Sequence, residues 1–199
     1  MRTYRRIVIA AAAVLAAAAV MSGCASSQTS SNSSGATSAT AAESNPVGDI
    51  PDNQAYVPFT PPQGLFTVSV PEGWARTADG AATIFTDKLN AVRVESHLRD
   101  SAPTVDSARA DELPGIASSV SGHRPGDVTV VNRKAGPAVL ITYQATSAPN
   151  GVTGKTGTDA VERYEFWRGG QEVILTLSGP VGADNLDPWR TITESLQWR

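Results

Sequence analysis

The sequence predicts an α+β domain built on a central antiparallel β-sheet with helices on both sides. Several short segments in the second half of the chain alternate apolar and polar residues with a period of two, as half-buried strands do. Two longer segments place apolar residues at helical spacing. These segments follow one another as strands, helix, strands and helix, an order that favours an antiparallel α+β fold over alternating βαβ units.

The N-terminal segment predicts export. Arginines occupy three of the first six positions, and the 15 residues from Ile7 to Met21 then carry no polar or charged side chain. This is the plan of a secretory signal peptide, with a basic and then an apolar region. As a helix the apolar run would cover about 22 Å, short of the ~30 Å hydrocarbon core of a bilayer. We therefore expect a signal peptide over residues 1–23 rather than a spanning helix.

Cys24 is the only cysteine, and it directly follows Met21-Ser22-Gly23. This stretch resembles the lipobox of bacterial lipoproteins. The resemblance implies cleavage between Gly23 and Cys24, a diacylglycerol on the thiol and an acyl group on the new amine. The alternative, an ordinary secretory signal, would leave a reactive free thiol in an exported protein. Because two or more acyl chains hold a protein stably on a membrane, Cys24 is predicted to anchor the chain to the extracytoplasmic side of the cell membrane.

The charge balance excludes one class of partner. The whole chain has 16 basic and 19 acidic residues, and removal of residues 1–23 takes away three arginines and no acid. The mature chain then has 13 basic against 19 acidic residues, a net charge of −6. Nucleic acid is therefore not expected as a partner, because its recognition needs a basic surface. With one cysteine there is no disulfide, so the fold must depend on its core.

Residues 24–54 are predicted to be an acylated, flexible tether. From Ala25 to Ser44 the chain is almost wholly small or polar, with one charge at Glu43. Such a composition has too little apolar surface to offset the entropy lost on ordering. As a coil the tether would span about 30 Å root-mean-square. The remaining residues, 55–199, are enough for a single globular domain with its own core.

The first strands lie between residues 66 and 99. Phe66–Val70 alternates apolar and hydroxylic residues and is stopped by Pro71-Glu72-Gly73, and Ala82–Thr86 is a second strand. Ala91–Arg99 alternates most clearly. In this third strand the predicted inward residues are Val92, Val94, Ser96 and Leu98, and the predicted solvent-facing residues are Arg93, Glu95, His97 and Arg99.

Two helices are predicted from their start signals. Thr104 can cap a helix that runs toward Val120 and is kinked or divided by Pro114. Asp187 can cap a closing helix with Pro188 at its first position. In that closing helix an apolar stripe is formed by Trp189, Ile192 and Leu196.

Four more strands are predicted between the helices. Val128–Arg133 and Ala138–Thr146 come first, and a Gly- and Thr-rich loop, Ser147–Thr158, follows them. Val161–Arg168 and Glu172–Ser178 then form a hairpin that turns at Gly169-Gly170.

Two stretches carry a resemblance to a known fold. A strand that ends in Pro71-Glu72-Gly73-Trp74, and Gly182–Trp189 with a helix running to Trp198, resemble the PsbP-like fold and its actinobacterial lipoprotein branch of the LpqN/LpqT type. The resemblance covers residues 64–199. It implies an α/β/α sandwich, a surface lipoprotein, and a binding or accessory role with no catalytic residue and no cofactor.

The sequence offers little for phosphate or metal binding. Gly151–Thr156 reads GVTGKT, but Pro149 stands where a phosphate-binding loop needs glycine, so we expect a solvated loop. Glu95 and His97 share one strand face, yet a zinc site needs three or four ligands, and His123 lies in a separate loop. No metal site is predicted.

The sequence also offers little evidence for catalysis. There is no Gly-x-Ser-x-Gly motif. A hydrolase that uses His97 or His123 with partners assembled in space stays open as an alternative.

The aromatic residues mostly fall at predicted core positions, and Trp167 is the exception. If Tyr164 and Phe166 point inward, Trp167 points the other way, so either a helix covers it or it is exposed as a contact residue. The function expected from the sequence is a lipid-anchored, non-enzymatic binding or accessory module that contacts envelope proteins. A carrier of a lipid or small apolar ligand is the other alternative.

Overall fold

The computed structural model describes residues 47–151 and 153–199, which belong to one compact unit, Ala42–Arg199. The predicted signal peptide, the cleavage site at Gly23 and Cys24, and tether residues 24–46 lie outside the described residues. Within the described part of the chain, no helix has both the length and the apolar character needed to span a membrane.

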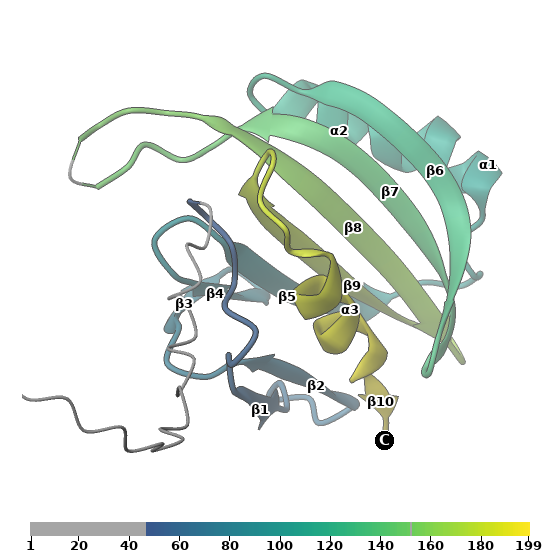
Figure 1. Cartoon of the computed structure of the whole chain (residues 1–199). Coiled ribbons are helices and arrows are strands. Elements are labelled where there is room, and N and C mark those ends of the chain that lie inside the picture. The colour runs from purple at the N-terminus through teal and green to yellow at the C-terminus, as the bar shows by residue number, and fades with distance from the viewer. Residues whose placement is uncertain (1–46, 152) are drawn as a thin grey trace, which may run out of the picture. The chain divides into compact units, whose positions relative to one another are not determined.

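A seven-stranded sheet dominates the fold, in the order β3-β4-β5-β9-β8-β7-β6 (Figure 1). Its strands are β3 (Ala75–Asp79), β4 (Ala82–Thr86), β5 (Ala91–Leu98), β6 (Arg124–Arg133), β7 (Gly136–Thr146), β8 (Thr158–Arg168) and β9 (Gln171–Pro180). A second, three-stranded sheet joins β1 (Tyr56–Phe59), β2 (Phe66–Pro71) and β10 (Gln197–Trp198). Every pairing in both sheets is antiparallel, so the predicted antiparallel, sheet-dominated fold is confirmed.

The main core lies on one face of the large sheet. Alternate residues of β5, β8 and β9 point into it, together with the three-stranded sheet and helix α3 (Leu186–Glu194). The predicted stripe of α3 is buried there, with Trp189 6% exposed, Ile192 0% and the following Leu196 1%. Burial of such side chains contributes about 1.5–3 kcal/mol each.

A smaller core lies on the opposite face, under the helical segment formed by α1 (Val105–Ser107), the π-helical turn η1 (Ala108–Glu112) and α2 (Leu113–Ser119). Ala108 and Leu113 pack there against Val128 of β6 and Ile141 of β7. Figure 1 shows α1 and α2 behind β6 and β7, and α3 in front of the sheet. The apolar residues of the helical segment pack on β6 and β7, and Glu112 of η1 reaches Arg163 of β8.

The predicted helix from Thr104 toward Val120 is found as three consecutive helical segments, so both its start and its division near Pro114 are confirmed. Thr104 caps α1, because its hydroxyl accepts from the backbone N–H of Ser107. The chain then widens into η1 before Pro114, which lies in the first turn of α2. A proline has no N–H and its ring clashes with the carbonyl four residues earlier, which explains the wider turn at this point.

The predicted start of α3 was wrong by two residues. The cap is Asn185 rather than Asp187, and Pro188 is the third helical residue. Asn185 makes no capping bond, because its side chain is bonded elsewhere in the core. The helix also ends at Glu194 rather than at Trp198, which lies in β10 opposite Phe66.

Strands β1, β3 and β10 were not predicted, and each gives a weak pattern. All five residues of β3 are exposed, so its sequence shows no apolar alternation. β10 has two residues and β1 has four, which is too short for a periodic signal. The predicted hairpin turn is confirmed, since Gly169 and Gly170 have φ of 57° and 85°, values that glycine tolerates best.

The folded domain begins before residue 55. Ile50 is 3% exposed and belongs to the main core. Its backbone N–H donates to Oδ1 of Asn185 at 2.8 Å, and the carbonyl oxygen of Gly48 accepts from the side-chain amides of Asn90 and Asn185. Residues 48–50, assigned to the tether by composition, are therefore fixed to the domain.

Candidate functional site

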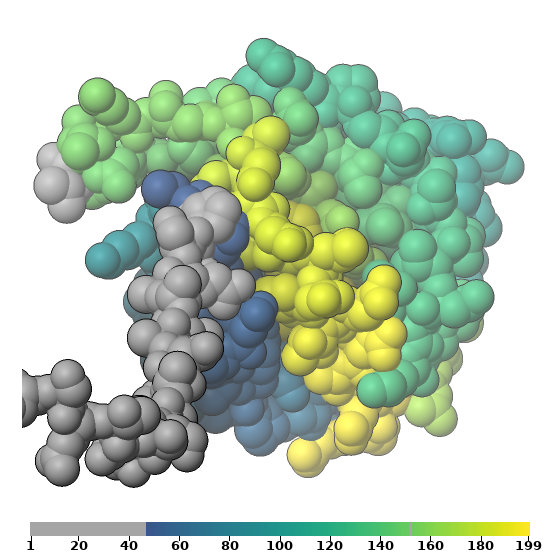
Figure 2. All heavy atoms as spheres, in the orientation of Figure 1, coloured from purple at the N-terminus to yellow at the C-terminus, as the bar shows by residue number. Residues whose placement is uncertain are grey.

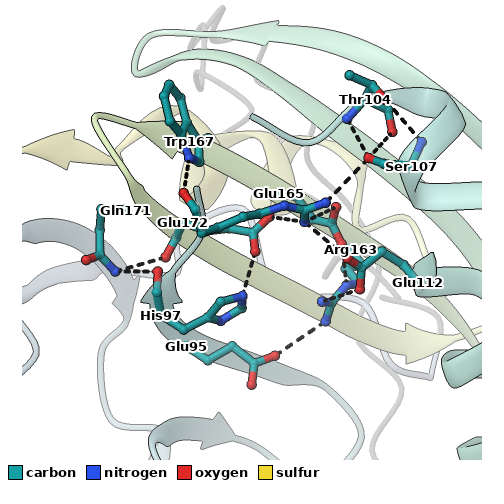
Figure 3. Close-up of polar contacts among 11 residues, drawn as sticks. Glu95, His97, Thr104, Ser107, Glu112, Arg163, Glu165, Trp167, Gln171 and Glu172 are labelled. Atoms are coloured by element: carbon teal, nitrogen blue, oxygen red, sulfur yellow. Dashed lines mark hydrogen bonds and ion pairs between the residues drawn. The ribbon is translucent and has the colours of Figure 1, made fainter. Parts of the chain in front are cut away.

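The most organised polar feature is a charged cluster on the sheet face that carries the helical segment (Figure 3). It includes both residues of the weak metal-site hypothesis, Glu95 and His97. The cluster comprises Arg93, Glu95 and His97 of β5, Arg99 just after it, Glu112 of η1, Arg163 and Glu165 of β8, and Glu172 of β9.

Strand register brings these side chains together. Glu95 of β5 lies opposite Ile174 of β9, which lies opposite Glu165 of β8. Two residues along the strands, and so on the same face, His97 lies opposite Glu172, which lies opposite Trp167. Because directly opposed residues share a face, the side chains of three strands meet there.

Arg163 and Arg99 hold the carboxylates of the cluster. Arg163 donates from Nε to Oε1 of Glu165 at 2.9 Å and from Nη1 to Oε1 of Glu95 at 3.4 Å. Arg99 donates from Nη1 to Oε1 of Glu172 at 2.7 Å and to Oε1 of Glu112 at 3.1 Å. Since Glu112 belongs to η1, these bonds also fasten the helical segment to the sheet.

Two of the carboxylates are buried. The side chains of Glu165 and Glu172 are 0% and 1% exposed. Oε2 of Glu165 has no hydrogen-bond partner within the described residues. Burial raises the pKa of Glu165 above its ordinary value, although the neighbouring Arg163 acts in the opposite direction. A buried carboxyl group of this kind holds a proton more readily than one in water.

The expectation of a solvated face on β5 was wrong for this cluster. The side chains of Arg99 and Glu95 are 18% and 23% exposed, because η1 brings Glu112 over them and β8 supplies Arg163. His97 is the more open member at 53%. Leu98, which was expected to point into the core, is 83% exposed because β5 ends there beside the hairpin turn.

The two histidines are not brought together. Nε2 of His97 lies 2.6 Å from Oε2 of Glu172. His123 packs on Tyr143, with ring centroids 5.4 Å apart. Tyr143 shares a register row with Ala91, six residues along β5 from His97, or about 20 Å at 3.3 Å per residue. Among the described residues no set of three His, Cys, Asp or Glu side chains could hold a metal ion.

Trp167 was expected to be either covered or exposed, and it is half-buried, between these two outcomes. Its indole Nε1 donates to the carbonyl oxygen of Arg99 at 2.8 Å, which fixes the ring. One side of Trp167 lines a recess of about 150 Å³. The other lining residues are Ala102, Pro103, Val130, Pro137, Ala138, Val139 and Glu165.

This recess, which we call the Trp167 recess, lies beside the charged cluster. Val130, another lining residue, is 57% exposed and adds apolar surface at the opening of the recess. Proline, valine, alanine and the fixed tryptophan make most of the wall apolar, with few rotatable bonds, and among the described lining residues Glu165 is the one that is charged.

The loop 147–158 does not form a phosphate cradle. The backbone N–H groups of Thr153 and Gly154 both donate to Asn150, and that of Gly157 donates to Ser147. These groups are therefore not free for an anion. Figure 2 shows the loop (green, upper left) projecting from the strands. A groove of about 630 Å³ lies between this loop and the β4–β5 connection, with Val47 and Val181 at its wall.

Sequence reasoning missed Glu112, Glu165, Glu172 and Val130 as site residues. A signal for the cluster was present, because Arg93-x-Glu95 and Arg163-x-Glu165 repeat the same spacing on two strands. The spacing places each arginine and glutamate on one face. The adjacency of β5, β9 and β8 was needed to show that these faces coincide.

Comparison with known proteins supports the fold and goes no further. No family model matches the chain, and no curated protein matches it. The solved structure of cyanobacterial PsbP (CyanoP) from Synechocystis is similar, with a TM-score of 0.51 and 11% identity over 78% of this chain and 100% of that one. This likeness supports a PsbP-like fold.

Two further solved structures are more distant. LpqN of Mycobacterium tuberculosis, described as involved in cell envelope biogenesis, has a TM-score of 0.39 and 15% identity over 73% of this chain and 91% of that one. A Bacteroides thetaiotaomicron protein has a TM-score of 0.48 and 16% identity over 71% of this chain. The present chain spans about half of that protein's length, 48%.

Proposed function

We propose that this chain is a lipid-anchored, non-enzymatic binding or accessory module on the outer face of the cell membrane, acting through contacts with envelope proteins. The observation that carries the proposal is the Trp167 recess. Its volume, about 150 Å³, resembles that of an engineered cavity that holds benzene. One apolar side chain of a partner therefore fits it.

The chemistry of the recess favours a protein contact. Tryptophan is enriched among residues that dominate binding energy, and these residues lie in well-packed pockets. The hydrogen bond from Trp167 to Arg99 holds the ring in place before a partner arrives, which lowers the entropy lost on binding. Val130 supplies exposed apolar surface at the rim.

The charged cluster supports a structural role for its members rather than a catalytic one. Arg99 and Arg163 are each bonded to carboxylates of the chain, and His97 lies against Glu172. Paired charges of this kind connect strands and helix. We include in the proposal the finer architecture, a PsbP-like α/β/α sandwich, and the anchoring through acyl chains on Cys24.

Site-specific photocrosslinking in intact cells tests the proposal. A photoreactive phenylalanine at Val130 should give an adduct with a defined envelope protein, and the adduct should be lost when Trp167→Ala is added. The matched control is the same probe at Val181, which is 49% exposed and lies outside the recess. Equal adducts at both positions, or none at Val130 in repeated experiments, would overturn the proposal.

A second candidate function is the carriage of a lipid or small apolar ligand. The groove beside the loop 147–158 favours it, because about 630 Å³ lies within the 300–1,000 Å³ typical of ligand sites. Native mass spectrometry of the mature chain should then show a co-purified mass. Repeated preparations that contain only the chain and its acyl groups would count against this candidate.

A further inference from the structure

The two edges of the seven-stranded sheet differ in how they are protected. An edge strand presents a row of free N–H and C=O groups, and natural proteins guard such rows with proline, charges or a bulge. β6, at one edge, begins with Arg124-Pro125 and has an irregular register between Pro125 and Val128. These features interrupt the row of free backbone groups, so β6 is a guarded edge.

β3, at the other edge, has neither a proline nor a bulge. Its register with β4 is unbroken from Ala75 to Asp79, and it contains no proline. All five residues are exposed. The sheet ends at β3, so within residues 47–151 and 153–199 one row of its peptide groups has no strand partner.

The two charges of β3 are both engaged within the chain. The guanidinium of Arg76 lies 4.7 Å from the ring centroid of Phe59, a cation–π contact. The carboxylate of Asp79 is paired with Arg93 of the charged cluster. Both residues stay exposed, Asp79 at 64% of its side chain, but each charge already has a partner within the chain.

We propose that the β3 edge is a second interaction surface, which binds an extended segment of a partner protein as an additional antiparallel strand. Only an extended backbone matches a row of alternating donors and acceptors. The other residues of β3, Ala75, Thr77 and Ala78, are small, and they leave room for bulky neighbours. The segment is therefore one with β-branched or aromatic residues and without proline.

A second copy of this chain fits the edge less well. Self-pairing centred on Thr77 would set Ala75 against Asp79 and Arg76 against Ala78, and self-pairing centred on Arg76 would oppose two arginines. Both arrangements bury little apolar surface, whereas cross-strand stabilisation comes mainly from large apolar pairs. The edge is thus complementary to a different sequence.

Panning of phage-displayed random nonapeptides against the mature, acylated protein in detergent micelles tests this inference. The selected peptides should alternate β-branched or aromatic residues. Ala78→Lys and Thr77→Lys, on opposite faces of β3, should each weaken binding of a selected peptide about tenfold or more. Thr129→Lys, an exposed position on the guarded strand β6, is the matched control and should leave binding unchanged.

Hydrogen exchange provides the second measurement. Amides of residues 75–79 that exchange quickly in the free protein should slow when the selected peptide binds. Peptides that bind the two β3 variants as well as the parent, or a panning that selects none, would overturn the inference.

Two other outcomes would also overturn it. Edge amides already slow in the free protein would mean that residues 25–46 occupy the edge. A dimer that Ala78→Lys dissociates would mean that a second copy does. Trp167→Ala should not affect peptide binding, so failure of this inference is distinguishable from failure of the proposed function.

Discussion

Trp167 and Arg99 are joined by a hydrogen bond of 2.8 Å from the indole Nε1 to the backbone carbonyl oxygen. Arg99 in turn binds Glu172 of β9 and Glu112 of η1 through its guanidinium. One residue therefore connects the indole of the Trp167 recess to the charged cluster and to the helical segment. The position of the ring depends on the loop that follows β5 as well as on its own strand.

The substitution Trp167→Phe removes the hydrogen bond but keeps an aromatic ring, so it separates the contributions of these two features to stability. We expect the free energy of unfolding to fall by about 1 kcal/mol, the usual net value of one hydrogen bond. Trp167→Ala also removes packing, so its loss should be larger. Urea denaturation of both variants measures the difference. A loss for Trp167→Phe equal to that for Trp167→Ala would contradict the separate role of the hydrogen bond.

The features that were predicted correctly from the sequence are those that depend on neighbouring residues. Alternation over Ala91–Arg99 and glycine at 169 and 170 depend on neighbouring residues. The strand and the turn were predicted correctly, but the inward position of Leu98 and the solvated outer face of the strand were not. The charged cluster was missed because it depends on which strands are neighbours. Glu95 and Glu165 are 70 residues apart in sequence and meet only through β9.

The N-terminal boundary of the domain could not be predicted from composition either. Residues 45–54 are mostly polar, like the predicted tether, and Val47 and Ile50 are the two large apolar residues among them. The burial of Ile50 depends on Asn90 and Asn185, which are 40 and 135 positions away in sequence. No pattern among neighbouring residues predicts a contact between residues so far apart in the sequence.

Asn185→Ala should be strongly destabilising. The side chain of Asn185 accepts from Ile50 and donates to Gly48 and Asn90, and both asparagines are less than 5% exposed. Its removal leaves buried polar groups without partners, each at a cost of about 1–3 kcal/mol. We expect a loss of at least about 2 kcal/mol by urea denaturation. Asp187→Ala, two residues further on and exposed, is the control and should be nearly neutral.

Ile50→Ala tests whether residues before 55 belong to the fold. Truncation of a buried isoleucine costs about 2–5 kcal/mol. Val47→Ala, at a position that is 81% exposed, is the matched control and should change the free energy of unfolding by less than about 0.5 kcal/mol. Equal, small effects of the two variants would mean that residue 50 belongs to the predicted tether and not to the folded domain.

Glu165→Gln should change how stability depends on pH. Burial raises the pKa of Glu165 in the folded protein, so the native state binds this proton more tightly than the unfolded state does. The resulting stabilisation is complete below the ordinary glutamate pKa, about 4.3, and is lost as pH rises through the raised value. Glutamine does not ionise, so the variant Glu165→Gln should not lose this stabilisation as pH rises.

The measurement is urea denaturation of both proteins at several pH values from about 4 to 7. The free energy of unfolding of the parent minus that of Glu165→Gln should decrease as pH rises. A difference that stays flat, or increases with pH, would contradict the raised pKa.

Cys24→Ala tests the predicted anchor. Acyl chains stabilise membrane binding by about 0.8 kcal/mol per buried CH₂, so loss of the attachment point should release the domain from the membrane fraction. Growth with an alkyne-bearing fatty acid should label the parent and Ser26→Ala, the matched control, but not Cys24→Ala. If Cys24→Ala stays membrane-bound through alkaline washing, the apolar run from Ile7 to Met21 holds the chain instead. The spanning helix, set aside because about 22 Å is short of the bilayer core, would then be the better interpretation.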